Sequence, residues 1–209
     1  MTEPAAAITD YVLAFESMIL AAWFIGQPAG RSDLHLWFVV FFIAAGVASA
    51  LGGTVHGFFA GHASRMGAVL WRGTLIAIGI VAASGWMIGA EVLWGEAPAG
   101  LMLAFVAVEF AAYAVVVTAV RDAFWIAAAN YLLSTGFLVI AYWAAYQSHP
   151  TGALEVGLAG LALTFVAALG QHLRVGFHPV YLNHNALYHL VQGMALAMIF
   201  WSGRYLVNS

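Results

Sequence analysis

The sequence predicts an all-α membrane protein, a bundle of seven transmembrane helices joined by short loops. Two observations of composition support this fold class: 64% of the 209 residues are hydrophobic, and only six basic and nine acidic residues are present. Soluble domains usually carry about 25% charged residues, whereas this chain carries 7%. The third observation is that the hydrophobic residues form long runs, each near or above the roughly 20 residues that cross a bilayer as a helix.

Seven such runs follow one another and together form a single transmembrane domain, residues 1–209. The predicted spans cover residues 8–26, 35–61, 68–93, 100–120, 123–146, 153–173 and 182–206. All the connections between them are short, which makes consecutive helices antiparallel neighbours and leaves no room between the spans for a domain outside the membrane.

The first run is expected to be a retained helix and not a cleaved signal peptide, because residues 1–4 contain no basic residue and Glu16 lies within the run. The second run ends in a segment with Gly and Arg, residues 61–65, and the third in residues 94–98, which contain Gly and Pro. These residue types mark turns and helix ends. The sequence therefore predicts breaks at both places.

The fourth and fifth runs are separated only by Arg121 and Asp122. Two adjacent charges in the middle of a membrane helix would be costly, so we expect a break there. Pro150 and Pro179 lie in the connections that end the fifth and sixth runs. The seventh run then carries the chain across the membrane once more.

The arginines indicate the orientation in the membrane. With seven spans, four Arg lie on one side (Arg65, Arg72, Arg121 and Arg174) and two on the other (Arg31 and Arg204). Basic residues favour the cytoplasmic side. We therefore expect a multi-pass protein of the bacterial inner membrane with a cytoplasmic N-terminus, surrounded by membrane lipid.

Composition also excludes several functions. All six basic residues are Arg, so the chain has no lysine that could hold retinal as a Schiff base. The absence of cysteine excludes disulfides, thiolate metal sites and cysteine nucleophiles. Six Arg against nine acidic residues give no basic footprint for nucleic acid.

Histidine is placed unevenly. Six of the eight His fall on the side of the membrane where the second and sixth runs end and the seventh begins. His56 and His189 lie inside apolar runs, where an ionisable side chain tends to face the bundle interior and find a partner. Four residues of this group are candidate metal ligands: His56, His172, His184 and His189.

Three imidazoles from two or three helices, with an open position for water, would suit zinc. Asn185 and Gln192 share a helix face with His189, at spacings of four and three residues, and are expected to orient a bound cofactor or substrate. His184 lies about 140° around a regular helix from His189 and joins such a site only from a frayed first turn. Haem held between two imidazoles is the alternative cofactor.

Two acidic residues lie deep in predicted spans. Glu16 is in the middle of the first run and Glu109 in the middle of the fourth, at depths where a charge is expensive and a functional role is the default hypothesis. They are candidate catalytic acid or base groups if the fold brings either near the histidines. In a transporter or channel they would be the proton- or ion-coupling groups.

The layout of seven short-looped spans, with His56 late in the second and His189 early in the seventh, resembles the superfamily of alkaline ceramidases, progestin/adiponectin-type receptors and haemolysin III-like proteins. In that superfamily three His hold zinc, two of them in a His-x-x-x-His motif, and the implied activity is hydrolysis of a lipid amide. The chain departs from the pattern at three positions. Asn185 replaces the first His of the motif, Gly52 replaces a Ser, and Arg72 stands where an Asp is expected.

The strings at residues 50–58 and 183–189 also resemble those of an uncharacterised bacterial seven-span family. Three functional hypotheses follow. The leading one is a cytoplasm-facing, His-rich pocket that binds zinc and hydrolyses a lipid amide or ester. The others are a small transporter or ion channel that uses Glu16 and Glu109, and a sensory module that binds a lipid or cofactor without turnover.

Overall fold

The computed structural model describes residues 3–27, 32–59, 64–95 and 99–208. It confirms an all-α bundle. The helices of the described chain are α1 (Pro4–Ile25), α2 (Ser32–Phe58), α3 (Arg65–Trp94), α4 (Ala99–Val115), α5 (Phe124–Ser148), α6 (Gly152–His172) and α7 (His184–Asn208), with a π-helical turn, η1 (Val116–Val120), that extends α4. Seven helical segments are long and apolar enough to cross a membrane. The protein is therefore a multi-pass membrane protein.

Local sequence explains where several of these helices begin and end. Pro4 occupies the first turn of α1, where its missing N–H costs no hydrogen bond, so α1 begins before the predicted span. The Ser64 side chain caps α3 by accepting a hydrogen bond from the backbone N–H of Gly67 at 3.0 Å. The backbone at Arg121 is extended, and η1 therefore ends at Val120. The predicted break between the fourth and fifth spans is thus confirmed.

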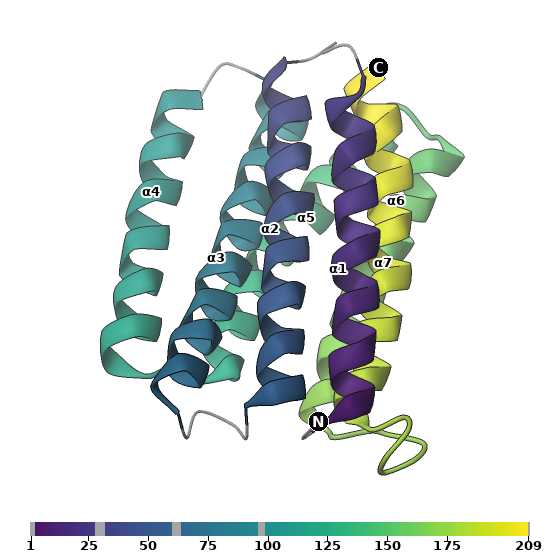
Figure 1. Ribbon diagram of the computed structural model, residues 1–209. Helices are drawn as coiled ribbons and strands as arrows, with labels where there is room; N and C mark the ends of the chain where they lie inside the picture. Colours follow the sequence, from purple (N-terminus) through teal and green to yellow (C-terminus); the bar gives the residue numbers. More distant parts are fainter. Residues whose placement is uncertain (1–2, 28–31, 60–63, 96–98, 209) are drawn as a thin grey trace.

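Six helices form a closed ring in the order α1, α2, α3, α5, α6, α7, with α7 packed again against α1. The seventh, α4, stands outside this ring and packs against α3 (Figure 1). The expectation that consecutive helices are neighbours is therefore wrong for the pair α4 and α5, because α5 packs against α3 and α6. Most of α4 is apolar and exposed on the bundle surface, an arrangement that lipid tolerates and water would not.

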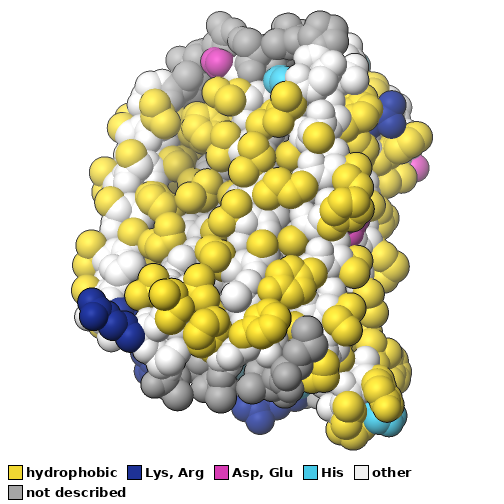
Figure 2. Space-filling model, viewed as in Figure 1, with side chains coloured by type: hydrophobic (Ala, Val, Ile, Leu, Met, Phe, Trp, Pro, Cys, Tyr) yellow, Lys and Arg dark blue, Asp and Glu magenta, His cyan; other side chains and the backbone are white. Residues whose placement is uncertain are grey.

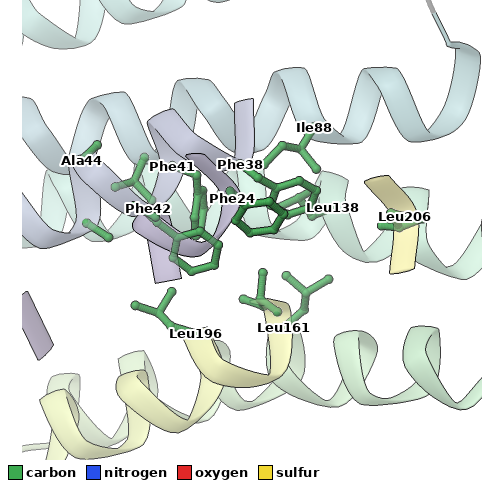
Figure 3. Close-up of a cluster of buried hydrophobic side chains, with 14 of the residues drawn as sticks. Phe24, Phe38, Phe41, Phe42, Ala44, Ile88, Leu138, Leu161, Leu196 and Leu206 are labelled. Atoms are coloured by element: carbon green, nitrogen blue, oxygen red, sulfur yellow. The ribbon is translucent and has the colours of Figure 1, made fainter. Parts of the chain in front are cut away.

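The two halves of the ring are filled differently. In the half where α1 ends and α2 begins, the rings of Phe24 and Phe38 stack with centroids 5.2 Å apart, and Phe42 stacks on Phe24 at 5.9 Å. Leu161 from α6 and Leu196 from α7 belong to the same buried cluster (Figure 3). This half therefore contains a packed apolar core, with a pocket of about 340 Å³ beside it between the ends of α3, α5 and α7.

The outer surface matches a lipid environment. Hydrophobic side chains cover most of the face shown in Figure 2, and the charged side chains visible there lie towards its ends and edges. Large apolar side chains such as Phe15, Leu101 and Val108 are more than two-thirds exposed. Exposure on this scale indicates contact with lipid.

Candidate functional site

The other half of the ring holds a cavity of about 230 Å³. All six ring helices contribute to its wall. The polar side chains in the wall include Asp10, His56, Gln171, Asn185, His189 and Gln192. The apolar side chains include Leu13, Ala45, Ala48, Ile78, Val81 and Leu196.

Polarity in the wall changes with depth. At a rise of 1.5 Å per residue, Asp10 lies about 9 Å from the start of α1, and His189 about 8 Å from the start of α7. Leu196 lies about 18 Å along α7, close to the middle of a hydrocarbon layer roughly 30 Å thick. Most polar side chains of the wall therefore lie towards the end of the bundle, beside the rings of Trp71 and Phe124, and the wall towards the membrane centre is apolar.

Asp10 and His189 form a buried polar contact in the cavity wall. His189 Nε2 lies 3.1 Å from Asp10 Oδ1, and the two side chains are 9% and 6% exposed. His189 Nδ1 lies 3.0 Å from Thr9 Oγ1. A β-carbon at Gly53 of α2 would stand 2.9 Å from the Asp10 Cβ, so glycine at this position allows α1 to approach α2 closely.

Hydrogen bonding indicates how protons are shared in this group. The Thr9 hydroxyl donates to the backbone oxygens of Ala5 and Ala6, at 2.9 and 3.0 Å, and is then an acceptor for Nδ1–H of His189. The contact between Nε2 and the Asp10 carboxyl needs one further proton between them. Asp10 and His189 therefore share a proton at the wall of the cavity.

A second polar group lies nearer the end of the bundle. His56 Nδ1 is 3.3 Å from Glu3 Oε2, which also accepts a hydrogen bond from Asn185 Nδ2 at 2.9 Å. Gln171 Nε2 donates to Asn185 Oδ1 at 2.6 Å. The His56 and His189 ring centroids are 6.3 Å apart, so the two groups are adjacent.

The structure brings four of the sequence-derived site residues to the cavity: His56, His189, Asn185 and Gln192. His172 is exposed and His184 is partly buried, and neither belongs to the cavity wall. Their neighbours Gln171 and Asn185 belong to it instead, because a step of one residue turns a helix by about 100°.

The expected convergence of His56 and His189 with a third histidine, His184 or His172, is not found in the cavity wall. Within the described residues, no group of three or more His, Cys, Asp and Glu side chains is placed to hold a metal ion. Both ring nitrogens of His189 already contact protein groups. A metal ion at His189 would need one of those contacts to open.

Glu16 and Glu109 are not part of the cavity wall. Glu16 lies at the packing contact between α1 and α7, where its Oε2 would be 2.7 Å from a β-carbon at Gly193. Glu109 is on α4, outside the ring, on the far side of α3 from α1 in Figure 1. The fold thus does not bring either acid into the cavity with the histidines.

Sequence reasoning missed Asp10, Thr9, Glu3 and Gln171. Asp10 and Glu3 stand at the edge of the first apolar run, where an acidic residue usually faces water. The signal for Asp10 was its position two residues inside the predicted span. Its partner, however, is in the last helix, and no local pattern pairs α1 with α7.

Fold and cavity together define a class of protein: a multi-pass helical membrane protein with a polar cavity inside its transmembrane domain. The chain belongs to DUF6962, a family of unknown function, whose model matches residues 5–208. Comparison with curated proteins and with solved structures gave no match. The resemblance to the ceramidase and haemolysin III superfamily stays a prediction.

Proposed function

We propose that the protein binds an amphiphilic, lipid-like molecule in its cavity. The polar end of the ligand would lie beside Asp10 and His189, and its apolar part between Leu13, Ala48 and Leu196. The observation that carries this proposal is the change from polar to apolar wall with depth, which matches the polarity of an amphiphile that enters a membrane.

The size of the cavity supports the same function. A volume of about 230 Å³ is slightly below the roughly 300–1,000 Å³ of pockets that enclose drug-sized ligands, so it suits a small amphiphile or the polar end and first carbons of a larger lipid. The Phe24 cluster packs in the opposite half of the ring, where a second pocket of about 340 Å³ lies between the ends of α3, α5 and α7.

We further propose that the cavity end faces the cytoplasm of a bacterial cell. Arg65 and Arg72 lie within the first eight residues of α3, and Arg121 and Arg174 lie beyond the ends of η1 and α6, all on this side. Arg204 is near the opposite end of α7. Arg31 lies outside the described residues.

Cysteine labelling tests this orientation. A single cysteine that replaces exposed Val180 should react with a membrane-impermeant maleimide only in inside-out vesicles. Reaction only in right-side-out vesicles would show that the cavity end faces away from the cytoplasm.

Photo-crosslinking tests the binding site. An octyl amphiphile that carries a diazirine, added to the protein in lipid nanodiscs, should label peptides from the inner faces of α1, α2 and α7. Ala48→Phe fills the apolar part of the cavity and should reduce this labelling about tenfold or more, because a steric cost of about 1.4 kcal/mol is already a factor of ten in affinity.

Ala162→Phe is the matched control, since Ala162 lies on an exposed face of α6. This variant should label like the natural protein at the cavity peptides. If cavity peptides are labelled equally in Ala48→Phe and in the natural protein, the label comes from surrounding lipid and the proposal is wrong.

Hydrolysis of the bound amphiphile is the second candidate function. The proton shared by Asp10 and His189 favours it, because an imidazole held by a carboxylate is a common acid and base in hydrolysis. Zinc bound by His56 and His189 would supply an activated water, and its binding would require His189 to give up its contact with Thr9 or with Asp10. Purified protein that contains about one equivalent of zinc, and loses it in His56→Ala, would support this function. Less than about a tenth of an equivalent would show that zinc is not the cofactor. A haem absorption band would identify the cofactor as haem.

A further inference from the structure

A cationic side chain lies among aromatic rings at the end of the bundle opposite the cavity. Arg204 is about one turn before the end of α7 at Asn208, where α7 lies beside the end of α1 (Figure 1). Its Cζ is 4.5 Å from the ring centroid of Trp23 on α1, and 5.3 and 5.9 Å from those of Trp201 and Phe200 on α7. Aromatic faces attract a cation at these distances. The three rings therefore help to hold the guanidinium in place.

The same rings show which way the Arg204 side chain points. Trp201 and Phe200 precede Arg204 by three and four residues, so they lie one turn nearer the middle of α7. The side chain therefore lies back over the preceding turn, the usual direction in a helix. For a helix centred in the bilayer, Arg204 is about 12 Å from the membrane centre, within half of a hydrocarbon layer roughly 30 Å thick. Its charge thus lies near the edge of that layer.

The described part of the chain supplies no anion for this cation. None of its carboxylates forms an ion pair with Arg204, and the guanidinium donates no hydrogen bond to another described residue. Arg72, by contrast, pairs with Asp122 at 3.3 Å. A guanidinium has five N–H donors, and the aromatic rings supply no lone pair to them. A partly buried charge at this depth is costly, so an anionic acceptor from the surroundings would stabilise it.

We infer that Arg204, held by Trp23 and Trp201, binds the phosphate of a phospholipid in the leaflet opposite the cavity end. Phospholipid phosphates lie beside the edge of the hydrocarbon layer, and a guanidinium binds a phosphate through two parallel N–H···O hydrogen bonds. Trp201 is 54% exposed, so surrounding lipid can reach the site. The site is separate from the cavity, and the inference does not depend on the proposed amphiphile binding.

Native mass spectrometry tests this lipid site. The protein is purified in detergent, freed of lipid and titrated with phosphatidylglycerol, phosphatidylcholine or diacylglycerol, all with the same acyl chains. Arg204→Gln removes the charge and the paired donors. It should weaken binding of the first phosphatidylglycerol at least about tenfold, the usual effect of one or two hydrogen bonds to a charged group. Phosphatidylcholine should also bind more weakly, whereas diacylglycerol, which has no phosphate, should bind both proteins equally.

Two further variants separate the shape of the guanidinium from its charge. Arg204→Lys preserves the charge but cannot donate two parallel hydrogen bonds, so its affinity for phosphatidylglycerol should lie between those of the natural protein and Arg204→Gln. Arg174→Gln is the matched control, because it removes the same charge at an exposed position between α6 and α7. This control should bind phosphatidylglycerol like the natural protein.

Three outcomes would overturn the inference. Equal weakening of all three lipids in Arg204→Gln would mean that the substitution disturbs helix packing and not phosphate binding. No weakening, or the same weakening in Arg174→Gln, would mean that phosphatidylglycerol has no site at Arg204. Displacement of bound phosphatidylglycerol by millimolar inorganic phosphate would identify a soluble phosphate, and not a lipid, as the ligand.

Discussion

His189→Leu is expected to lower the free energy of unfolding by about 3 kcal/mol. The substitution preserves much of the side-chain volume but leaves both oxygens of the buried Asp10 carboxyl without a partner. Removing one member of a buried acid–base pair costs about 3–5 kcal/mol, and water that enters the adjacent cavity would reduce the cost towards the lower value. Titration with sodium dodecyl sulfate in mixed micelles measures the change.

The double variant Asp10→Leu/His189→Leu should recover most of this loss, to within about 1 kcal/mol of the natural protein, because no unpaired polar group remains. The coupling between the two positions would then be at least about 2 kcal/mol, larger by whatever Asp10→Leu alone costs, and well above the average of about 0.6 kcal/mol for interhelical hydrogen bonds in a membrane protein. Additive effects of the two substitutions would mean that Asp10 and His189 do not interact.

His172→Leu is the matched control for this experiment. His172 is exposed at the last turn of α6 and does not line the cavity. Its replacement should change the free energy of unfolding by less than about 0.5 kcal/mol, as is usual for surface positions. A loss as large as that of His189→Leu would mean that His172 has a buried partner.

Gly160→Ala should lower the free energy of unfolding by about 2–3 kcal/mol. A β-carbon at Gly160 would lie 2.9 Å from the backbone oxygen of Ala195 and 3.2 Å from the backbone nitrogen of Ile199. Backbone atoms of α7 cannot rotate away, so the whole of α6 or α7 must shift and loosen its packing. Overpacking of this kind costs about 1–3 kcal/mol.

Gly170→Ala on the same helix separates packing from helix propensity. Nothing lies within 4 Å of a β-carbon built at Gly170. Alanine is favoured over glycine inside a helix by about 0.5–1 kcal/mol, so this variant should be neutral or more stable. Equal effects of the two substitutions in the same denaturant titration would show that α6 and α7 are not in close contact at Gly160.

Much of the fold could be predicted because membrane helices are encoded locally. Each span is a continuous run long enough to cross the bilayer, and the break at Arg121 and Asp122 follows from the cost of two charges. The candidate site was predictable only in part. His56 and His189 stood out as ionisable residues in apolar runs, whereas Asp10 stood at the edge of a run and gave a weaker signal.

Side-chain direction explains the errors at the other histidines. His172 and Gln171 are adjacent in sequence, yet a rotation of about 100° puts Gln171 in the cavity wall and leaves His172 exposed. When a helix is apolar on nearly every face, its hydropathy pattern does not predict which face points into the bundle. The orientation is decided by which neighbours the helix packs against.

The sequence by itself determined that the chain crosses the membrane seven times, because a backbone in lipid must satisfy its hydrogen bonds within each segment. Only the tertiary structure decided that α4 stands outside a ring of six helices, that α1 and α7 meet, and that Asp10 faces His189. Helix packing depends on contacts between residues as far apart as 10 and 189, and these contacts leave no periodic pattern in either segment alone.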